Sequence, residues 1–112
     1  MTLTSEPVDM QAMRLAAGRA TGLLKALANP DRLLLLCQLS QGEQCVSELQ
    51  NLLSIVQPTL SQQLGVLREE RLVNTRREGK QIYYCIASKE ALAVMQVLYA
   101  QFCNPFQEKI ND

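Results

Sequence analysis

The strongest constraint on the fold is a change of hydrophobic period that falls near residue 71. Before this point, Leu60, Leu64 and Leu67 recur at the spacing of one face of an α-helix. After it, residues 72–86 alternate between apolar and polar side chains on either side of a short turn, which is typical of a β-hairpin. The sequence therefore predicts a mainly α-helical chain that carries one small β-hairpin.

Four more helices are expected from start and stop signals. Asp9 can cap the first, Asn29 with Pro30 after it can start the second, and Ser88 can cap the last. Either Cys45 or Ser47 lies at the start of the third. The expected ranges are 9–28, 30–42, 46–53 and 88–104, with Gly42 and Pro105 as stops, Pro58 at the first position of the helix in 57–70, and Leu33–Leu36 buried.

Length and composition predict one domain over residues 9–104, between a flexible N-terminus at 1–8 and a C-terminal tail at 105–112. The 112 residues carry a net charge of zero, and no apolar run approaches a membrane span. The first ten residues do not form a signal peptide, so a cytoplasmic protein is expected. The chain has no histidine, no paired carboxylates and no phosphate-binding loop. We therefore expect neither an enzyme nor a bound cofactor.

Polar side chains crowd the start of the segment 57–70, which reads QPTLSQQLGVLREE. Glutamine, serine and threonine can read base edges in a DNA major groove. On this segment alone, a solvated polar face on a core helix is the more favoured interpretation. Val56 cannot cap the helix, so either its start is weakly anchored or Gln57 caps it. The candidate base-reading residues are Gln57, Thr59, Ser61, Gln62 and Gln63.

The flanking elements reverse that balance. A short helix, a turn, a second helix and a β-hairpin follow in the order of a winged helix-turn-helix. Arg76, Arg77 and Lys80 give the hairpin a basic tip that can reach phosphates or the minor groove. With zero net charge, any DNA-binding face is local. The small residues of the first helix, between Ala16 and Gly22, fit close packing within one subunit or a dimer interface equally well.

Three motifs, LLKALANPDRLLLLCQL, QPTLSQQLGVLREERLV and REGKQIYYCI, resemble the ArsR family of winged-helix repressors from about residue 10 to 104. The resemblance implies a homodimer built on the first and last helices, an operator with an inverted repeat, and release by an inducer. Most familiar members sense metals. Here the cysteine site of the third helix has Ser47 at its second position, and the histidine site lacks its ligands. No metal site is predicted.

The BigR- and SqrR-type branch of the family fits better. Its resemblance implies that Cys37 and Cys103 sense persulfides or polysulfides, and that the targets are sulfide detoxification genes. A direct disulfide needs Cα atoms roughly 4.4–6.8 Å apart, and a longer spacing favours a bridge with extra sulfur atoms. Such a bridge would tie the DNA-reading half to the dimer interface.

Other interpretations of the cysteines stay open. Cys37 is alternatively a small core residue. Neither Cys37 nor Cys103 lies at a helix N-terminus, and Cys103 lies at a C-terminus, where the helix dipole disfavours a thiolate. Cys45 is expected at a helix start and Cys85 on the outer face of a strand. The alternative functions are a thiolate metal or arsenite sensor and a redox-sensitive activator that displaces a silencer.

Overall fold

The structure is a computed structural model that describes residues 9–103. It confirms the winged helix-turn-helix, with two helices before it and one helix after it. The elements are α1 (Met10–Leu27), α2 (Pro30–Leu39), β1 (Gln44–Cys45), α3 (Val46–Leu53), α4 (Thr59–Glu69), β2 (Val73–Glu78), β3 (Gln81–Ile86) and α5 (Lys89–Phe102). The expected N-terminal segment 1–8 and tail 105–112, together with Asn104 and the stop at Pro105, lie outside the described residues. No helix in the described part is long and apolar enough to cross a membrane.

Three of the expected helix caps are confirmed. The Asp9 side chain accepts hydrogen bonds from the backbone N–H groups of the first turn of α1. The Asn29 Oδ1 atom accepts from Arg32 N at 3.0 Å, with Pro30 at the first helical position. The Ser88 Oγ atom accepts from Ala91 N at 3.0 Å. These side chains satisfy donors that a helix start leaves without a partner, and each is worth about 1 kcal/mol.

Several expected boundaries shift. The residue at the N-cap of α3 is Cys45, whose backbone N–H donates to Glu48 Oε1 at 2.9 Å, so Ser47 is not the cap. Pro58 is the N-cap residue of α4 and not its first helical residue. Helix α2 ends at Leu39 and not at Gly42, whose positive φ of 148° belongs to the loop beyond.

The hairpin belongs to a three-stranded sheet. Strands β2 and β3 pair in antiparallel register from Val73 opposite Ile86 to Glu78 opposite Gln81, close to the expected 72–77 and 81–86. Gly79 in the turn has a φ of 63°, which glycine adopts without steric cost. The short strand β1 pairs with the other edge of β3, so the strand order is β1-β3-β2. This two-residue strand is not expected from sequence, because it is too short to show alternation.

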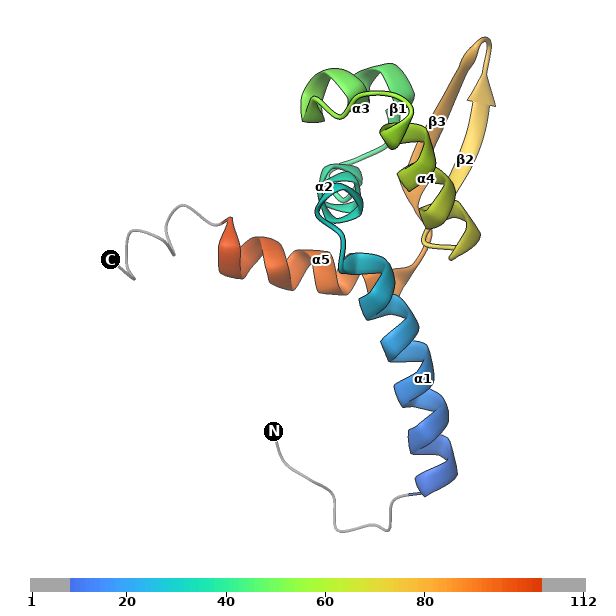
Figure 1. The fold of residues 1–112 in the computed structure, drawn as a ribbon, viewed down its shortest axis with the longest axis vertical. Coiled ribbons are helices and arrows are strands. Elements are labelled where there is room, and N and C mark those ends of the chain that lie inside the picture. The colour runs from blue at the N-terminus through green and yellow to red at the C-terminus, as the bar shows by residue number, and fades with distance from the viewer. Residues whose placement is uncertain (1–8, 104–112) are drawn as a thin grey trace, which may run out of the picture.

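The core fills the space between α2, α3, α4 and the sheet. Its six most buried large side chains are at most 1% exposed: Leu35, Leu36, Leu49, Leu60, Leu64 and Leu67. Burying one such side chain contributes about 1.5–3 kcal/mol. The expectation that Leu33–Leu36 are all interior is wrong for Leu34, which is 47% exposed. We call the hairpin of β2 and β3 the wing. Helix α2 runs through the centre, with α3, α4 and the wing on one side and α1 and α5 extending away on the other (Figure 1).

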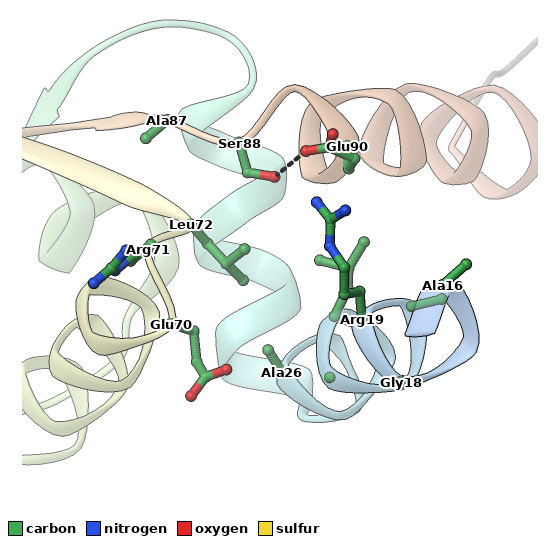
Figure 2. Close-up of a pocket in the computed structure, with 13 residues that line it drawn as sticks. Ala16, Gly18, Arg19, Ala26, Glu70, Arg71, Leu72, Ala87, Ser88 and Glu90 are labelled. Carbon is green, nitrogen blue, oxygen red and sulfur yellow. Dashed lines mark hydrogen bonds between the residues drawn. The ribbon is translucent and has the colours of Figure 1, made fainter. Parts of the chain in front are cut away.

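Helix α1 is largely unburied. Only Ala26 and Leu27 at its C-terminal end join the core, whereas Met13, Leu15 and Leu24 are 50–67% exposed. A cavity of about 860 Å³ separates α1 from the end of α4 and the start of α5. Ala16 and Gly18 line the α1 side of this cavity, and Arg19 points from α1 toward the first turn of α5 (Figure 2).

Candidate nucleic-acid interface and cysteine pair

The turn between α3 and α4 fixes the helix-turn-helix. Ser54 ends α3 in the left-handed conformation and donates its N–H to Gln50 O at 3.0 Å. Ile55, in the turn, is 7% exposed and joins the core. The three leucines of α4 face the same core, so its opposite face is turned outward. Ser61 and Gln62 are exposed on α4, while Thr59 and Gln63 are half-buried.

The start of α4 is closed by Gln57. Its Oε1 atom accepts from Ser61 N at 3.2 Å and from Ser61 Oγ at 2.6 Å. Gln57 thus supplies an acceptor for an N–H of the first turn, as a capping side chain does. Gln57 is not the N-cap residue, which is Pro58, but its side chain anchors the first turn of α4 from the preceding position. The Gln57 and Ser61 side chains are presented as one hydrogen-bonded unit.

The neighbouring glutamines of α4 differ in their contacts. Gln63 Oε1 accepts from Arg32 Nη1 at 2.9 Å. Gln62 is exposed, and within residues 9–103 its side chain makes no hydrogen bond. Sequence reasoning missed Arg32, because 31 residues separate it from its partner and no local pattern joins them.

The wing carries basic side chains in unequal states. Arg76 donates from Nε and Nη2 to the two carboxylate oxygens of Glu43, both at 2.7 Å, and from Nη1 to Glu78 at 2.8 Å. Its guanidinium also lies 4.8 Å from the ring centroid of Tyr83. The hydrogen bond from Arg76 holds the pKa of the Glu43 carboxyl below its ordinary value. Arg76 is therefore already paired by two carboxylates.

The other two basic residues lie nearer the turn. Arg77 donates from Nε to Gly79 O at 3.1 Å, and Lys80 is exposed within the turn itself. Neither forms an ion pair among the described residues. Arg77 and Lys80 are the basic charges that the tip presents to an approaching polyanion.

Cys37 and Cys103 line the same apolar pocket, although 66 positions separate them in sequence. Its volume is about 350 Å³, and its other lining residues are Leu33, Leu34, Met95, Leu98, Tyr99 and Phe102. Cys37 is half-buried on α2, while Cys103 is exposed at the C-cap of α5. Burial, and to a smaller extent the charge of Cys103, raises the pKa of the Cys37 thiol. The pocket therefore brings the two thiols together without activating Cys37.

The other two cysteines lie elsewhere. Cys45 is 4% exposed at the start of α3, with Sγ 3.2 Å from Ser47 Oγ. Cys85 on β3 is half-buried and pairs in register with Asn74, whereas the adjacent Tyr84 packs against the core. All four cysteines are free. Among residues 9–103 there is no group of three His, Cys, Asp or Glu side chains placed to hold a metal ion.

Comparison with known proteins places this architecture. Residues 29–75 match the family described as bacterial regulatory protein, arsR family. The chain is 53% identical over 98 residues to a biofilm growth-associated repressor from Agrobacterium fabrum, covering 88% of this chain and 84% of that protein. The crystal structure of the transcriptional repressor BigR from Xylella fastidiosa superposes with a TM-score of 0.78 at 46% identity, covering 86% of this chain and 98% of the other.

Reduced HlyU from Vibrio cholerae superposes with a TM-score of 0.81 at 40% identity, and the match covers 84% of this chain and 99% of that one. The likeness thus extends beyond the helix-turn-helix to nearly the whole length of these proteins. The chain belongs to the ArsR family of bacterial regulatory proteins, as a DNA-binding transcriptional regulator of the winged helix-turn-helix type.

Proposed function

We propose that the protein is a homodimeric repressor that releases its operator when reactive sulfur species join Cys37 to Cys103. The single observation that carries this proposal is that both thiols line one apolar pocket between α2 and α5. Similarity to proteins named as repressors supports the repressor output. Since the proposed target is operator DNA, the proposed site of action is the cytoplasm.

DNA recognition is assigned to the outward face of α4 and to the wing. Thr59, Gln62 and the hydrogen-bonded Gln57–Ser61 pair supply donors and acceptors for base edges in the major groove. Arg77 and Lys80 supply phosphate contacts from the wing. Gln63 and Arg76 are weaker candidates for direct DNA contact, because Arg32 binds the first and two carboxylates bind the second.

Dimerisation is assigned to α1 and α5. One subunit leaves Met13 and Leu15 of α1 and Phe102 of α5 at least half exposed. The small residues of α1 line the cavity in Figure 2, where a second copy of the chain could approach closely. A two-fold dimer would place two copies of α4 about 34–36 Å apart, which is the spacing of successive major grooves on one face of DNA.

The proposed sensing chemistry is an exchange between thiolates and sulfane sulfur. The Cys37 thiolate attacks an inner sulfur of a hydropolysulfide, one S–S bond breaks, and a shorter hydropolysulfide anion leaves. Cys37 then carries a short chain that ends in S–SH. The Cys103 thiolate attacks the sulfur next to that end and expels hydrosulfide, which closes a bridge with at least one added sulfur. The polysulfide is the oxidant, and the two thiols lose their protons to solvent.

The bridge would release DNA through geometry. Cys37 lies on α2, which contacts the recognition helix α4, whereas Cys103 ends the dimerisation helix α5. A covalent link between them changes how the DNA-reading part is held on the dimer. A small change in the separation of the two recognition helices weakens binding to two half-sites of fixed spacing.

Operator release after chemical treatment tests this proposal. The reduced protein is treated with polysulfide, peroxide, zinc or arsenite, and its affinity for a DNA duplex that it selects from a random pool is measured. Polysulfide should make the unaltered protein and the control Cys85→Ser release the duplex. Cys37→Ser and Cys103→Ser should stay bound to it. Release of both sensor variants would refute the proposal. Equal release by peroxide would refute selectivity for sulfur, and release by zinc or arsenite alone would favour a metal sensor.

The likeness to reduced HlyU favours a second candidate function, because the V. cholerae relative is described as a transcriptional activator. In this alternative the reduced dimer displaces a silencing protein from DNA. Its thiol chemistry would be the same, but its transcriptional output would have the opposite sign. Transcription measured with and without the chain, in the absence of any silencer, separates the two, because only a repressor lowers expression there.

A further inference from the structure

Arg32 joins three parts of the molecule through one side chain. It lies in the first turn of α2, where Asn29 caps its backbone N–H. Its Nε atom donates to Ala26 O at 2.6 Å and its Nη2 atom to Lys25 O at 3.2 Å. Its Nη1 atom donates to Gln63 Oε1 on α4 at 2.9 Å. One guanidinium therefore contacts the end of α1 and the half-buried Gln63 of α4.

The chemistry of each group suits this arrangement. The last carbonyls of α1 carry partial negative charge, which suits a guanidinium. Lys25 O also accepts from the backbone N–H of Ala28 at 3.3 Å, whereas Ala26 O accepts from Arg32. Arginine offers several N–H donors in a planar fork and no acceptor. Gln63 must therefore present its oxygen to Arg32. The hydrogen bond is charge-assisted and part-buried, so it is stronger than one between two neutral exposed groups.

We propose that Arg32 is the positioning residue of the recognition helix, and that Gln63 receives it and does not read bases. The inference rests on α4 being the DNA-reading helix, but it is independent of the sulfur chemistry. The hydrogen bonds of Arg32 hold the part of α4 that carries Gln62 against the C-terminal end of α1, the helix assigned to the dimer. Arg32 thereby sets the orientation of each α4 relative to the dimer.

The contrast between Gln62 and Gln63 provides the matched comparison. The two residues are consecutive and chemically identical, but successive residues of an α-helix point about 100° apart. Gln62 is exposed, and within residues 9–103 it makes no side-chain hydrogen bond, whereas Gln63 is half-buried and bound. A negative charge at position 63 would be neutralised by Arg32. The same charge at position 62 would face the negatively charged duplex without a cation beside it.

The test compares Gln63→Glu with Gln62→Glu in the full chain. Affinity is measured for a duplex that the unaltered protein selects from a random pool and for a scrambled duplex of the same composition. Gln63→Glu should bind the selected duplex nearly as well as the unaltered protein. Gln62→Glu should lose at least about tenfold, because it sets like charges against each other.

Two results of this comparison would overturn the proposal in different ways. A similar loss for both variants would contradict the role of Arg32 and Gln63 alone. Full binding by both variants would show that α4 does not lie against DNA, so the proposed recognition surface would fail as well.

The salt dependence of binding by an Arg32 variant separates a positioning role from a direct phosphate contact. Arg32→Gln should weaken binding to the selected duplex about 10- to 100-fold, the equivalent of one charge-assisted hydrogen bond. The dependence of log affinity on log salt should stay constant, because Arg32 does not neutralise a phosphate. A fall of about one unit in this slope would show a phosphate contact and overturn the proposal. If Arg32→Gln does not fold, the affinities of the Gln62→Glu and Gln63→Glu variants still test the proposal.

Discussion

The half assigned to DNA reading, which holds α3, α4 and the β2–β3 hairpin, and the half assigned to dimerisation, which holds α1 and α5, differ in how much apolar surface one chain covers. In the reading half, the core side chains Leu49, Leu60 and Leu67 are fully buried, although Leu52 of α3 is 57% exposed and Val56 in the turn is 67% exposed. In the other half, Leu15 of α1 is 67% exposed and Phe102 of α5 is 71% exposed. Exposed apolar surface on this scale marks a site for another molecule. One subunit therefore completes the core of the reading half by itself, whereas α1 and α5 leave apolar side chains uncovered, as the proposed dimer requires.

Truncation of a buried leucine should change stability more than any other substitution considered, and it tests the difference between the two halves. Leu60→Ala removes a side chain with 0% exposure, so the free energy of unfolding should fall by about 2–5 kcal/mol. Leu24→Ala, at 59% exposure in one subunit, is the matched variant in α1. Its cost should depend on protein concentration, because it weakens association. Denaturant unfolding at several protein concentrations checks both variants. A loss of stability in Leu24→Ala that does not depend on protein concentration would contradict the assignment of α1 to the dimer interface.

Within the reading half, base contacts and phosphate contacts should separate. Gln62→Ala should cost about 1–3 kcal/mol for the selected duplex and relax base preference at one position of the half-site. Lys80→Ala should weaken binding evenly across sequences and lower the salt slope by about one unit. Binding measured across salt concentrations and duplex variants distinguishes them. Identical behaviour would show that α4 is not the base-reading element.

A smaller effect is expected at the glycines of α1. A Cβ atom added at Gly22 or at Gly65 of α4 would meet nothing within 4 Å in one subunit. Either change to alanine should therefore stabilise its helix by about 1 kcal/mol. Only Gly22→Ala should also raise the dissociation constant of the dimer, because it lies on the face assigned to the partner. Sedimentation of both variants checks this, and an unchanged dimer would remove the small-residue face from the interface.

The smallest effect concerns the pocket where the halves meet. Because burial raises the pKa of Cys37, the folded chain keeps this thiol protonated at pH values where the unfolded chain ionises it. Its contribution to stability is thus present below the ordinary thiol pKa and is lost as pH rises through the raised value. Alkylation of Cys37, followed by peptide mass, should have its midpoint above that of an ordinary thiol. Cys103→Ser should shift the midpoint down only in part, since burial remains.

Local patterns predicted the winged helix-turn-helix because hydrophobic period and capping residues act over a few positions. Asp9, Asn29 and Ser88 each cap the helix that follows directly. The contacts that decide which candidate residues are free to meet DNA join positions far apart in the sequence. Arg32 meets Gln63 across 31 residues, and Arg76 meets Glu43 across 33. No periodicity shows such pairs, so sequence could not separate Gln62 from Gln63 or Arg76 from Lys80.

The cysteine pair was predicted through family resemblance and not through local physics. No local pattern marks either cysteine as reactive, and burial in an apolar pocket raises the pKa of the Cys37 thiol. The resemblance selected Cys37 and Cys103 from the four cysteines, and both line one pocket in the structure. The structure adds that Cys45 and Cys85 do not line that pocket.

The mass of the polysulfide-treated chain tests the central claim most directly. The reduced, full-length protein is treated, digested without reductant, and its cross-linked peptides are weighed. The account predicts one linked pair, the peptide of Cys37 joined to that of Cys103, with the mass of at least one added sulfur atom and the loss of two hydrogens. Sulfur found on Cys45 or Cys85 while Cys37 and Cys103 remain free thiols would contradict it.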